Sequence, residues 1–153
     1  MGSRLRRPTA VAILLILCAA AGGAELPVTT KVLPNGCTLA VVENHQAPVV
    51  AIRIYVTRTG SLYEGGHLGS GISHYCEQVV HGGSTTSRTE AETARLLQSI
   101  GASTNAYTSR DVTCYYGETH VASFDLMLEL MADWMQNCRL DAREVLRERQ
   151  VVK

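Results

Sequence analysis

The sequence predicts an α+β domain built on a largely antiparallel sheet with helices packed on it. Three observations predict this class: runs of β-branched and apolar residues near the start, two capping-box motifs that begin later helices, and a strand-forming stretch between helices. The predicted order is three strands, two helices, two strands and two helices, with no internal repeat. Such blocks favour antiparallel pairing over a parallel βαβ array.

Residues 1–24 have the three parts of a secretory signal peptide. Arg4, Arg6 and Arg7 form a positive start, residues 10–21 are apolar, and small residues precede a predicted cleavage after Ala24. The alternative is a membrane anchor, but the apolar run is shorter than the about 20 residues that span a bilayer. We therefore expect residues 25–153 to form an exported domain, periplasmic or secreted, with no stable membrane span once the signal is removed.

Charge and cysteine content narrow the classes of partner. Acidic and basic residues balance at 14 each, but three of the arginines lie in the leader, so the remaining domain is mildly acidic. Without a basic stripe, we expect no nucleic-acid partner. Four cysteines remain in the domain: Cys37, Cys76, Cys114 and Cys138. Their irregular spacing favours free thiols, although three disulfide connectivities are possible.

Turn signals divide the first half of the domain. Pro34-Asn35-Gly36 predicts the turn of a hairpin between residues 31–33 and 37–43. Residues 49–58 alternate as a half-buried strand should, with Ile52, Ile54 and Val56 on one face. The glycine-rich residues 59–70 predict a loop, and a short helix follows, closed by two glycines at 82 and 83.

The second half alternates helices and strands. A capping box at Thr89–Glu92 begins a helix that ends near Gly101, and residues 103–108 and 112–118 follow as two strands. Residues 121–138 form the longest helix. Its predicted core stripe is Phe124, Leu128, Met131 and Met135, with Met127, Leu130 and Trp134 beside it. A second capping box, Asp141–Glu144, begins a charged helix that reaches Lys153.

The short helix over residues 71–81 carries the candidate chemistry. His74 and Glu77 are three residues apart, so they share one helical face. An imidazole that can bind a metal and a carboxylate that can act as a general base, on one face, are typical of a metal-assisted hydrolase. The inverted zinc motif H-x-x-E-H requires a second histidine directly after the glutamate, and Gln78 stands there instead.

Four segments, in this order, resemble the N-terminal domain of the pitrilysin/insulinase-type (M16) zinc peptidases, the family that includes the mitochondrial processing peptidases. Residues 33–49 resemble the opening hairpin of that family, and residues 71–84 resemble its metal-binding helix with the Gly-Thr that follows. Asn105 to Tyr115 resembles its substrate-side strand, and residues 148–152 resemble the approach to its last metal ligand.

The resemblance implies a fold and a set of roles. An active member would bind zinc through His74, a second histidine and a distal glutamate, which would lie two residues beyond Lys153. Glu77 would be the general base that activates the zinc-bound water. Asn105, Ala106, Tyr107 and Thr108 would bind a peptide as an added strand. A second M16-like domain, in the same chain or another, would complete a peptide chamber.

Gln78 puts the zinc site in doubt. A glutamine amide is not among the usual zinc ligands of proteins. His81 lies about 10 Å along an intact helix from His74, too far to share one ion, and Cys76 points to another face. We expect a catalytically degenerate domain that binds peptide or forms the chamber with a partner half, and we expect bound zinc only if the domain is active. The alternative is an active zinc endopeptidase with an unusual ligand set.

Overall fold

The computed structural model describes residues 26–151, so the predicted leader and the last two residues lie outside the described residues. The chain divides after Gln46 into two compact units. In the first, β1 (Val28–Val32) pairs antiparallel with β2 (Thr38–Val42). Gly36 has a φ of 84°, which glycine adopts without strain, in the predicted turn. The predicted hairpin is confirmed.

The second unit follows the predicted order of strands and helices. Its elements are β3 (Val49–Thr57), α1 (Ile72–Val80), α2 (Glu90–Ser99), β4 (Ser103–Thr108), β5 (Val112–His120), α3 (Phe124–Asn137) and α4 (Ala142–Val151). The segment between β3 and α1, predicted as loop, also contains two single-turn 3₁₀ helices, Ser61–Tyr63 and Gly65–His67. No helix among residues 26–151 is long and apolar enough to cross a membrane.

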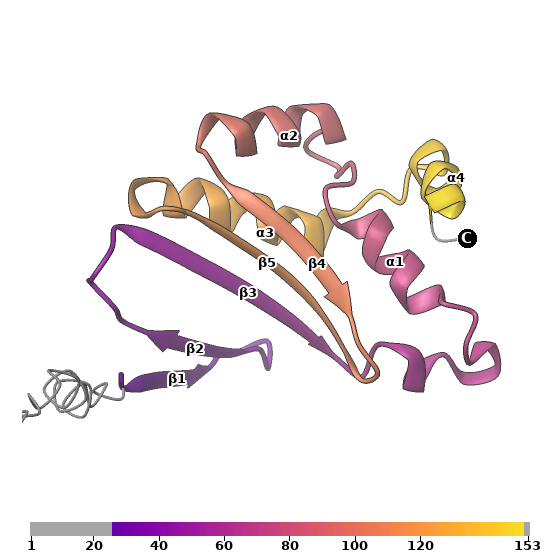
Figure 1. Cartoon of the computed structure of the whole chain (residues 1–153), viewed down its shortest axis with the longest axis horizontal. Helices are drawn as coiled ribbons and strands as arrows, with labels where there is room; N and C mark the ends of the chain where they lie inside the picture. Colours follow the sequence, from indigo (N-terminus) through magenta and orange to yellow (C-terminus); the bar gives the residue numbers. More distant parts are fainter. Residues whose placement is uncertain (1–25, 152–153) are drawn as a thin grey trace, which may run out of the picture. The chain divides into compact units, whose positions relative to one another are not determined.

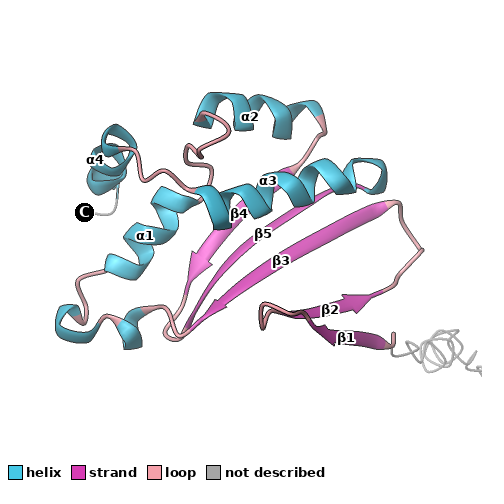
Figure 2. Cartoon of the chain, turned by 180° about the vertical axis from the view of Figure 1, so that it is seen from behind, coloured by secondary structure: helices cyan, strands magenta, loops and turns pink. Residues whose placement is uncertain are grey.

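The sheet of this unit has the strand order β3-β5-β4, and both pairings are antiparallel. β5 is therefore the central strand. Helix α3 lies over one face of the sheet (Figure 2), and α1 lies beside β4 (Figure 1). The predicted α+β class with a largely antiparallel sheet is confirmed.

The core lies between α3 and the sheet. Met127, Met131 and Trp134 of α3 are at most 1% exposed and pack against Tyr115 of β5. Gly117 leaves room for α3, because a Cβ at this position would lie 2.1 Å from the Met127 methyl group. All four cysteines are free thiols in the described residues, and Cys114 is fully buried.

The predicted core stripe of the longest helix was partly wrong. Phe124 and Leu128 are 39% and 43% exposed, whereas Leu130 and Met127, placed beside the stripe, are fully buried. The direction in which a helix turns its face depends on the sheet that it covers. Apolar residues on neighbouring stripes of α3 left that direction open in the sequence.

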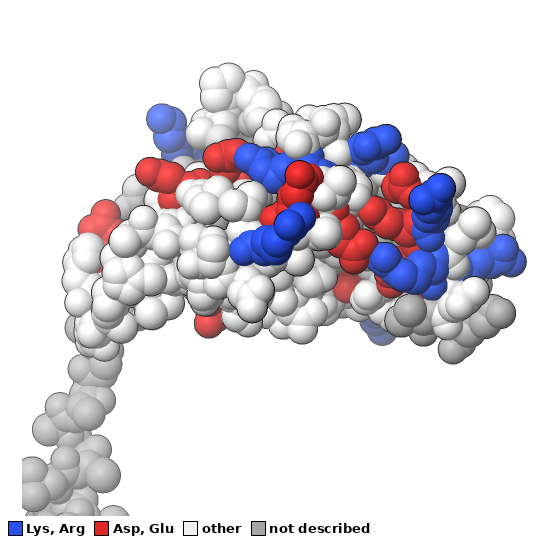
Figure 3. All heavy atoms as spheres, turned by 90° about the horizontal axis from the view of Figure 1, so that it is seen from above, with Lys and Arg blue, Asp and Glu red and all other residues white. Residues whose placement is uncertain are grey.

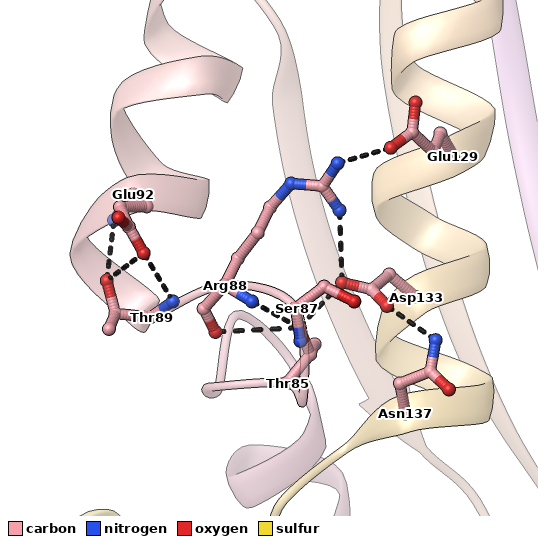
Figure 4. Close-up of polar contacts among 8 residues, drawn as sticks. All are labelled: Thr85, Ser87, Arg88, Thr89, Glu92, Glu129, Asp133 and Asn137. Carbon is pink, nitrogen blue, oxygen red and sulfur yellow. Dashed lines mark hydrogen bonds and ion pairs between the residues drawn. The ribbon is translucent and has the colours of Figure 1, made fainter.

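The segment between α1 and α2 is held to α3 by a polar network (Figure 4). The carboxylate of Asp133 accepts hydrogen bonds from Thr85 at 2.6 Å, from Asn137 at 2.6 Å and from Arg88 at 3.1 Å. Arg88 also pairs with Glu129. Burial acts to raise the pKa of Asp133, but the three donors and the Arg88 charge outweigh it and hold that pKa below its usual value.

Both predicted capping boxes place helix starts correctly, but only one forms. At α2, Thr89 accepts from the Glu92 amide, and the Glu92 carboxylate accepts from the Thr89 amide at 2.8 Å. At α4, Asp141 accepts from the Arg143 amide at 2.9 Å. The Glu144 carboxylate does not complete that box and instead bonds Ser84 through both the amide, at 2.9 Å, and the hydroxyl.

Replacing Asp133 tests the network. Asp133→Ala leaves the donors of Thr85, Arg88 and Asn137 without their acceptor and is expected to cost about 2–3 kcal/mol of unfolding free energy. The control Glu129→Ala, at a side chain that is 58% exposed, should cost less than about 1 kcal/mol. Urea unfolding measures both, and equal losses would contradict the assigned role of Asp133.

Because the pKa of Asp133 is lowered in the folded state, the stabilisation that its carboxylate contributes depends on pH. It is fully present above the unfolded-state pKa of about 3.9, and it is lost as the pH falls through the lower folded-state pKa. The difference in stability between the parent and Asp133→Ala should therefore shrink on acidification below about pH 4.

Candidate functional site

A buried glutamate positions the start of α1. The Glu64 carboxylate, at 8% exposure, accepts hydrogen bonds from the amides of Gly69 and Ser73, both at 3.0 Å. The bond from Ser73 is the largest cause of a pKa below the usual glutamate value, and burial opposes it. Glu64 therefore closes the glycine-rich turn onto the first turn of α1. The sequence predicts only a loop over this segment, and no motif in it singles out Glu64.

Helix α1 brings the three predicted residues together. Glu77 is 2% exposed, Gln78 is half-buried and His74 is exposed. The Gln78 amide nitrogen lies 3.3 Å from His74 Nε2 and donates to Glu77 Oε1 at 3.3 Å. The three side chains thus form one hydrogen-bonded group centred on the amide of Gln78.

Strand β4 completes this group from the other side. The Thr108 hydroxyl donates to the second oxygen of Glu77 at 2.6 Å. Thr108 lies 3.3 Å from the Thr113 hydroxyl, which lies 3.0 Å from that of Thr59. The predicted peptide-binding strand and the predicted base are therefore joined by a direct hydrogen bond. No motif in the sequence predicts this contact.

A cleft of about 650 Å³ lies between α1 and β4. It contains all three α1 residues and most of the predicted substrate strand: its walls include His74, Glu77, Gln78, Ala106, Tyr107 and Thr108. Asn105 is exposed and is not among the lining residues; its side-chain oxygen accepts from the Ala106 amide at 2.8 Å. The two groups of candidates, 27 or more residues apart in sequence, thus share one site.

The site also has a buried phenol as its neighbour. Tyr115 of β5 is 6% exposed, and burial raises its pKa well above the usual tyrosine value. The negative charge of Glu77 acts in the same direction. Tyr115 is therefore neutral and offers the carboxylate an apolar wall without a competing charge.

Neither alternative ligand reaches His74. The His81 ring lies beyond the end of α1 and packs edge-on against Trp134, with ring centroids 5.4 Å apart. Burial lowers the pKa of His81, and its Nε2 has no hydrogen-bond partner among the described residues. Cys76 is exposed and lines a separate cavity of about 370 Å³ between β3 and α1. Helix α1 stays intact through Val80, so it does not unwind to bring His81 back.

These residues do not fit a zinc ion. Residues 26–151 contain no group of three His, Cys, Asp or Glu side chains that could hold a metal. The group facing His74 Nε2 is the amide nitrogen of Gln78, which carries hydrogens and has no lone pair to donate. The distal glutamate expected from the resemblance would lie beyond Lys153.

Helix α4 is held by polar contacts to α1, to the segment after α1 and to the start of α2. Tyr75 donates to the carbonyl of Val145, Glu144 bonds Ser84, and Arg147 forms a two-pronged ion pair with Glu90 at 2.9 and 3.1 Å. On the face drawn in Figure 3, acidic and basic side chains lie next to one another. The contact from Tyr75 therefore ties α4 to the helix that carries His74, Glu77 and Gln78.

Comparisons with known proteins give the family of this fold. The profile of the insulinase family, peptidase family M16, matches residues 38–153. The chain belongs to this family. It spans only about a quarter of the length of the curated relatives that it matches.

Relatives in two kingdoms illustrate the range of the family. The chain is 32% identical over 84% of its length to a probable mitochondrial-processing peptidase subunit beta of Arabidopsis thaliana, covering 23% of that protein. It is 35% identical over 78% of its length to an uncharacterized zinc protease of Rickettsia felis, covering 28% of that protein.

Two solved structures have the same fold. A protease from Helicobacter pylori superimposes with a TM-score of 0.74 at 30% identity, over 83% of this chain and 30% of that one. An inactive M16 peptidase domain from Pseudomonas fluorescens superimposes with a TM-score of 0.73 at 17% identity, over 82% of this chain and 30% of that one. The second likeness concerns the fold alone.

Thr108→Val tests the bond between β4 and the buried carboxylate. The substitution keeps the shape of the side chain but removes one of the two donors to Glu77, and it is expected to cost about 1–2 kcal/mol of unfolding free energy. Thr104→Val is the matched control, because Thr104 is half-buried on the same face of β4. If chemical denaturation gave the same stability for both variants, the hydrogen bond from Thr108 to Glu77 would not stabilise the site.

Proposed function

We propose that this domain binds peptides in an extended conformation along β4 and does not itself hydrolyse them. The observation that carries the proposal is the position of β4: within residues 26–151 it pairs with β5 alone, and its free edge lines the cleft beside α1. An exposed strand edge is a template for an added strand, whose backbone pairing places little demand on peptide sequence.

The register of the hairpin shows which backbone groups a peptide would meet. Ser109 donates to the carbonyl of Val112 at 2.8 Å, so this pair is of the hydrogen-bonded kind. Hydrogen-bonded and non-hydrogen-bonded pairs alternate in an antiparallel ladder. The amides and carbonyls of Thr104, Ala106 and Thr108 therefore point away from β5, towards the free edge.

The Asn105 side chain occupies one of these groups. Its oxygen accepts from the outward-pointing Ala106 amide at 2.8 Å. A peptide carbonyl could replace that oxygen in a one-for-one exchange of hydrogen bonds, with a small net change in free energy. Asn105 thus satisfies the edge while no peptide is bound.

The proposal that the domain is catalytically degenerate rests on Gln78. A hydrolytic zinc site needs three protein ligands and an open position for water. Here the second histidine is replaced, and both oxygens of Glu77 already accept hydrogen bonds. We therefore propose that the domain works without zinc. We also propose that it is exported, and that a second M16-like domain in the same chain or in another completes the peptide chamber.

One observation favours a second candidate, an active zinc endopeptidase. His74 and Glu77 keep the family spacing and lie together at the cleft, and several relatives are named zinc proteases. The two candidates differ in metal content.

Metal analysis separates these candidates. Full-length protein, purified and then equilibrated with zinc, is expected to carry far less than one zinc ion per chain and to leave a mixed peptide library uncut. The His74→Ala variant should carry the same low amount. Stoichiometric zinc in the parent that disappears in His74→Ala, together with peptide cleavage, would establish the endopeptidase instead.

Peptide binding is tested by a proline at the free edge. Ala106→Pro removes an outward-pointing amide and leaves the ladder to β5 intact, which edge strands tolerate. We expect the affinity for an unstructured fluorescent peptide to fall about tenfold or more, because the proline leaves a peptide carbonyl without a donor, and about 1.4 kcal/mol is a factor of ten. Fluorescence anisotropy on the full-length protein measures this loss.

The matched control lies on the opposite edge of the same sheet. Ala51 of β3 is exposed and pairs with Glu118, in a register that also directs its amide away from β5. Ala51→Pro should leave peptide affinity unchanged when thermal melting shows that it is folded. Equal affinities of the parent and a folded Ala106→Pro protein would rule out strand addition at β4.

A further inference from the structure

We infer that Gln78 is a built-in substitute for a metal ion: its amide holds His74 and Glu77 in place and completes the site without a cation. The inference starts from the position of one atom. The amide nitrogen of Gln78 lies 3.3 Å from His74 Nε2 and 3.3 Å from Glu77 Oε1. A single nitrogen therefore serves both groups that the family motif directs towards a metal centre.

The donor inventory gives the direction of both bonds. A glutamine NH₂ group carries two hydrogens and accepts none. Glu77 accepts one hydrogen, so the other is available to His74, whose Nε2 must then be an unprotonated acceptor with the ring hydrogen on Nδ1. The positive end of the amide dipole thus faces a nitrogen lone pair and a carboxylate, as a cation would.

Burial makes the bond from Gln78 to Glu77 necessary. Glu77 is 2% exposed, and a buried carboxylate without partners is costly. Its two oxygens have one donor each, Thr108 from β4 and Gln78 from its own helix. Removing the Gln78 donor leaves one oxygen of the buried Glu77 carboxylate unpaired. In a metal site, the charge of the cation compensates such an oxygen.

The surroundings also select the orientation of the amide. If the Gln78 side chain were reversed, its carbonyl oxygen would face the Glu77 carboxylate, and that contact would be repulsive. A metal ion at His74 would require that reversal and would break both hydrogen bonds. The site is therefore indifferent to metal, because the amide of Gln78 already serves both side chains.

Thermal melting of the full-length protein tests this inference, which rests on the proposed absence of zinc catalysis. The parent should melt at the same temperature in 100 µM zinc and in a chelator. Gln78→Leu, which keeps the bulk but has no donor, should melt lower by about 3 °C or more. Gln136→Leu is the matched control, because Gln136 is exposed and also lies in the last turn of its helix, α3.

Gln78→Glu gives the sharper result. It replaces the NH₂ group by a second carboxylate oxygen beside Glu77, so the two negative charges repel each other and favour a cation between them and His74. This variant should melt lower than the parent in chelator and regain several degrees when zinc is added, whereas Gln136→Glu should not respond. A zinc-dependent rise in the parent that is lost in His74→Ala would overturn the inference.

A measurement on the parent gives a result that does not depend on whether Gln78→Leu folds. Nitrogen-15 NMR of the histidine side chains, with the His74 signals assigned from their loss in His74→Ala, should show the hydrogen on Nδ1 and an unprotonated Nε2. Gln78→Leu, if folded, should lose this preference. A hydrogen on Nε2 in the parent would sink the inference.

The two proposals fail in different ways. If peptides do not bind but the melting and NMR results are as expected, the role of Gln78 holds and strand addition at β4 is wrong. If peptides bind and no zinc is found, but Gln78→Leu melts with the parent and His74 carries its hydrogen on Nε2, the peptide-binding function holds and the role of Gln78 is wrong.

Discussion

The arrangement of the site depends on the buried carboxylate of Glu77. A negative charge at 2% exposure persists only where donors reach it, and here one donor comes from α1 and the other from β4. This requirement links the helix to the edge strand at a fixed separation. The cleft between them is therefore a consequence of satisfying one charge, and its polar floor is already complete when nothing is bound.

The rest of the unit keeps α1 where this charge needs it. Glu64 ties the turn before α1 to its first residues, and Glu144 of α4 holds Ser84 just after it. Further along, Asp133 anchors the next turn to α3 through Thr85 and Arg88. Each of these carboxylates accepts hydrogen bonds from a connecting segment. Acidic side chains therefore satisfy the donors of these segments and fix their positions.

Most of the fold could be predicted from local signals, because turns, capping residues and alternation depend on neighbours in sequence. The positions of His74, Glu77 and Gln78 on one helical face follow in the same way. The contact between Thr108 and Glu77 could not be predicted, because it spans 31 residues and depends on the tertiary placement of β4. Glu144 shows the opposite failure: a correct local motif was overridden when a distant segment offered better donors.

The Asn105 side chain that bonds the Ala106 amide has a consequence for the behaviour of the protein in concentrated solution. A strand edge open to peptides is equally open to the same strand of another molecule, and such pairing can propagate into insoluble assemblies. The Asn105 side chain fills one pairing group of that edge, the Ala106 amide, until an incoming strand exchanges for it. A peptide and a second copy of β4 would therefore meet the same backbone groups and would compete for one edge.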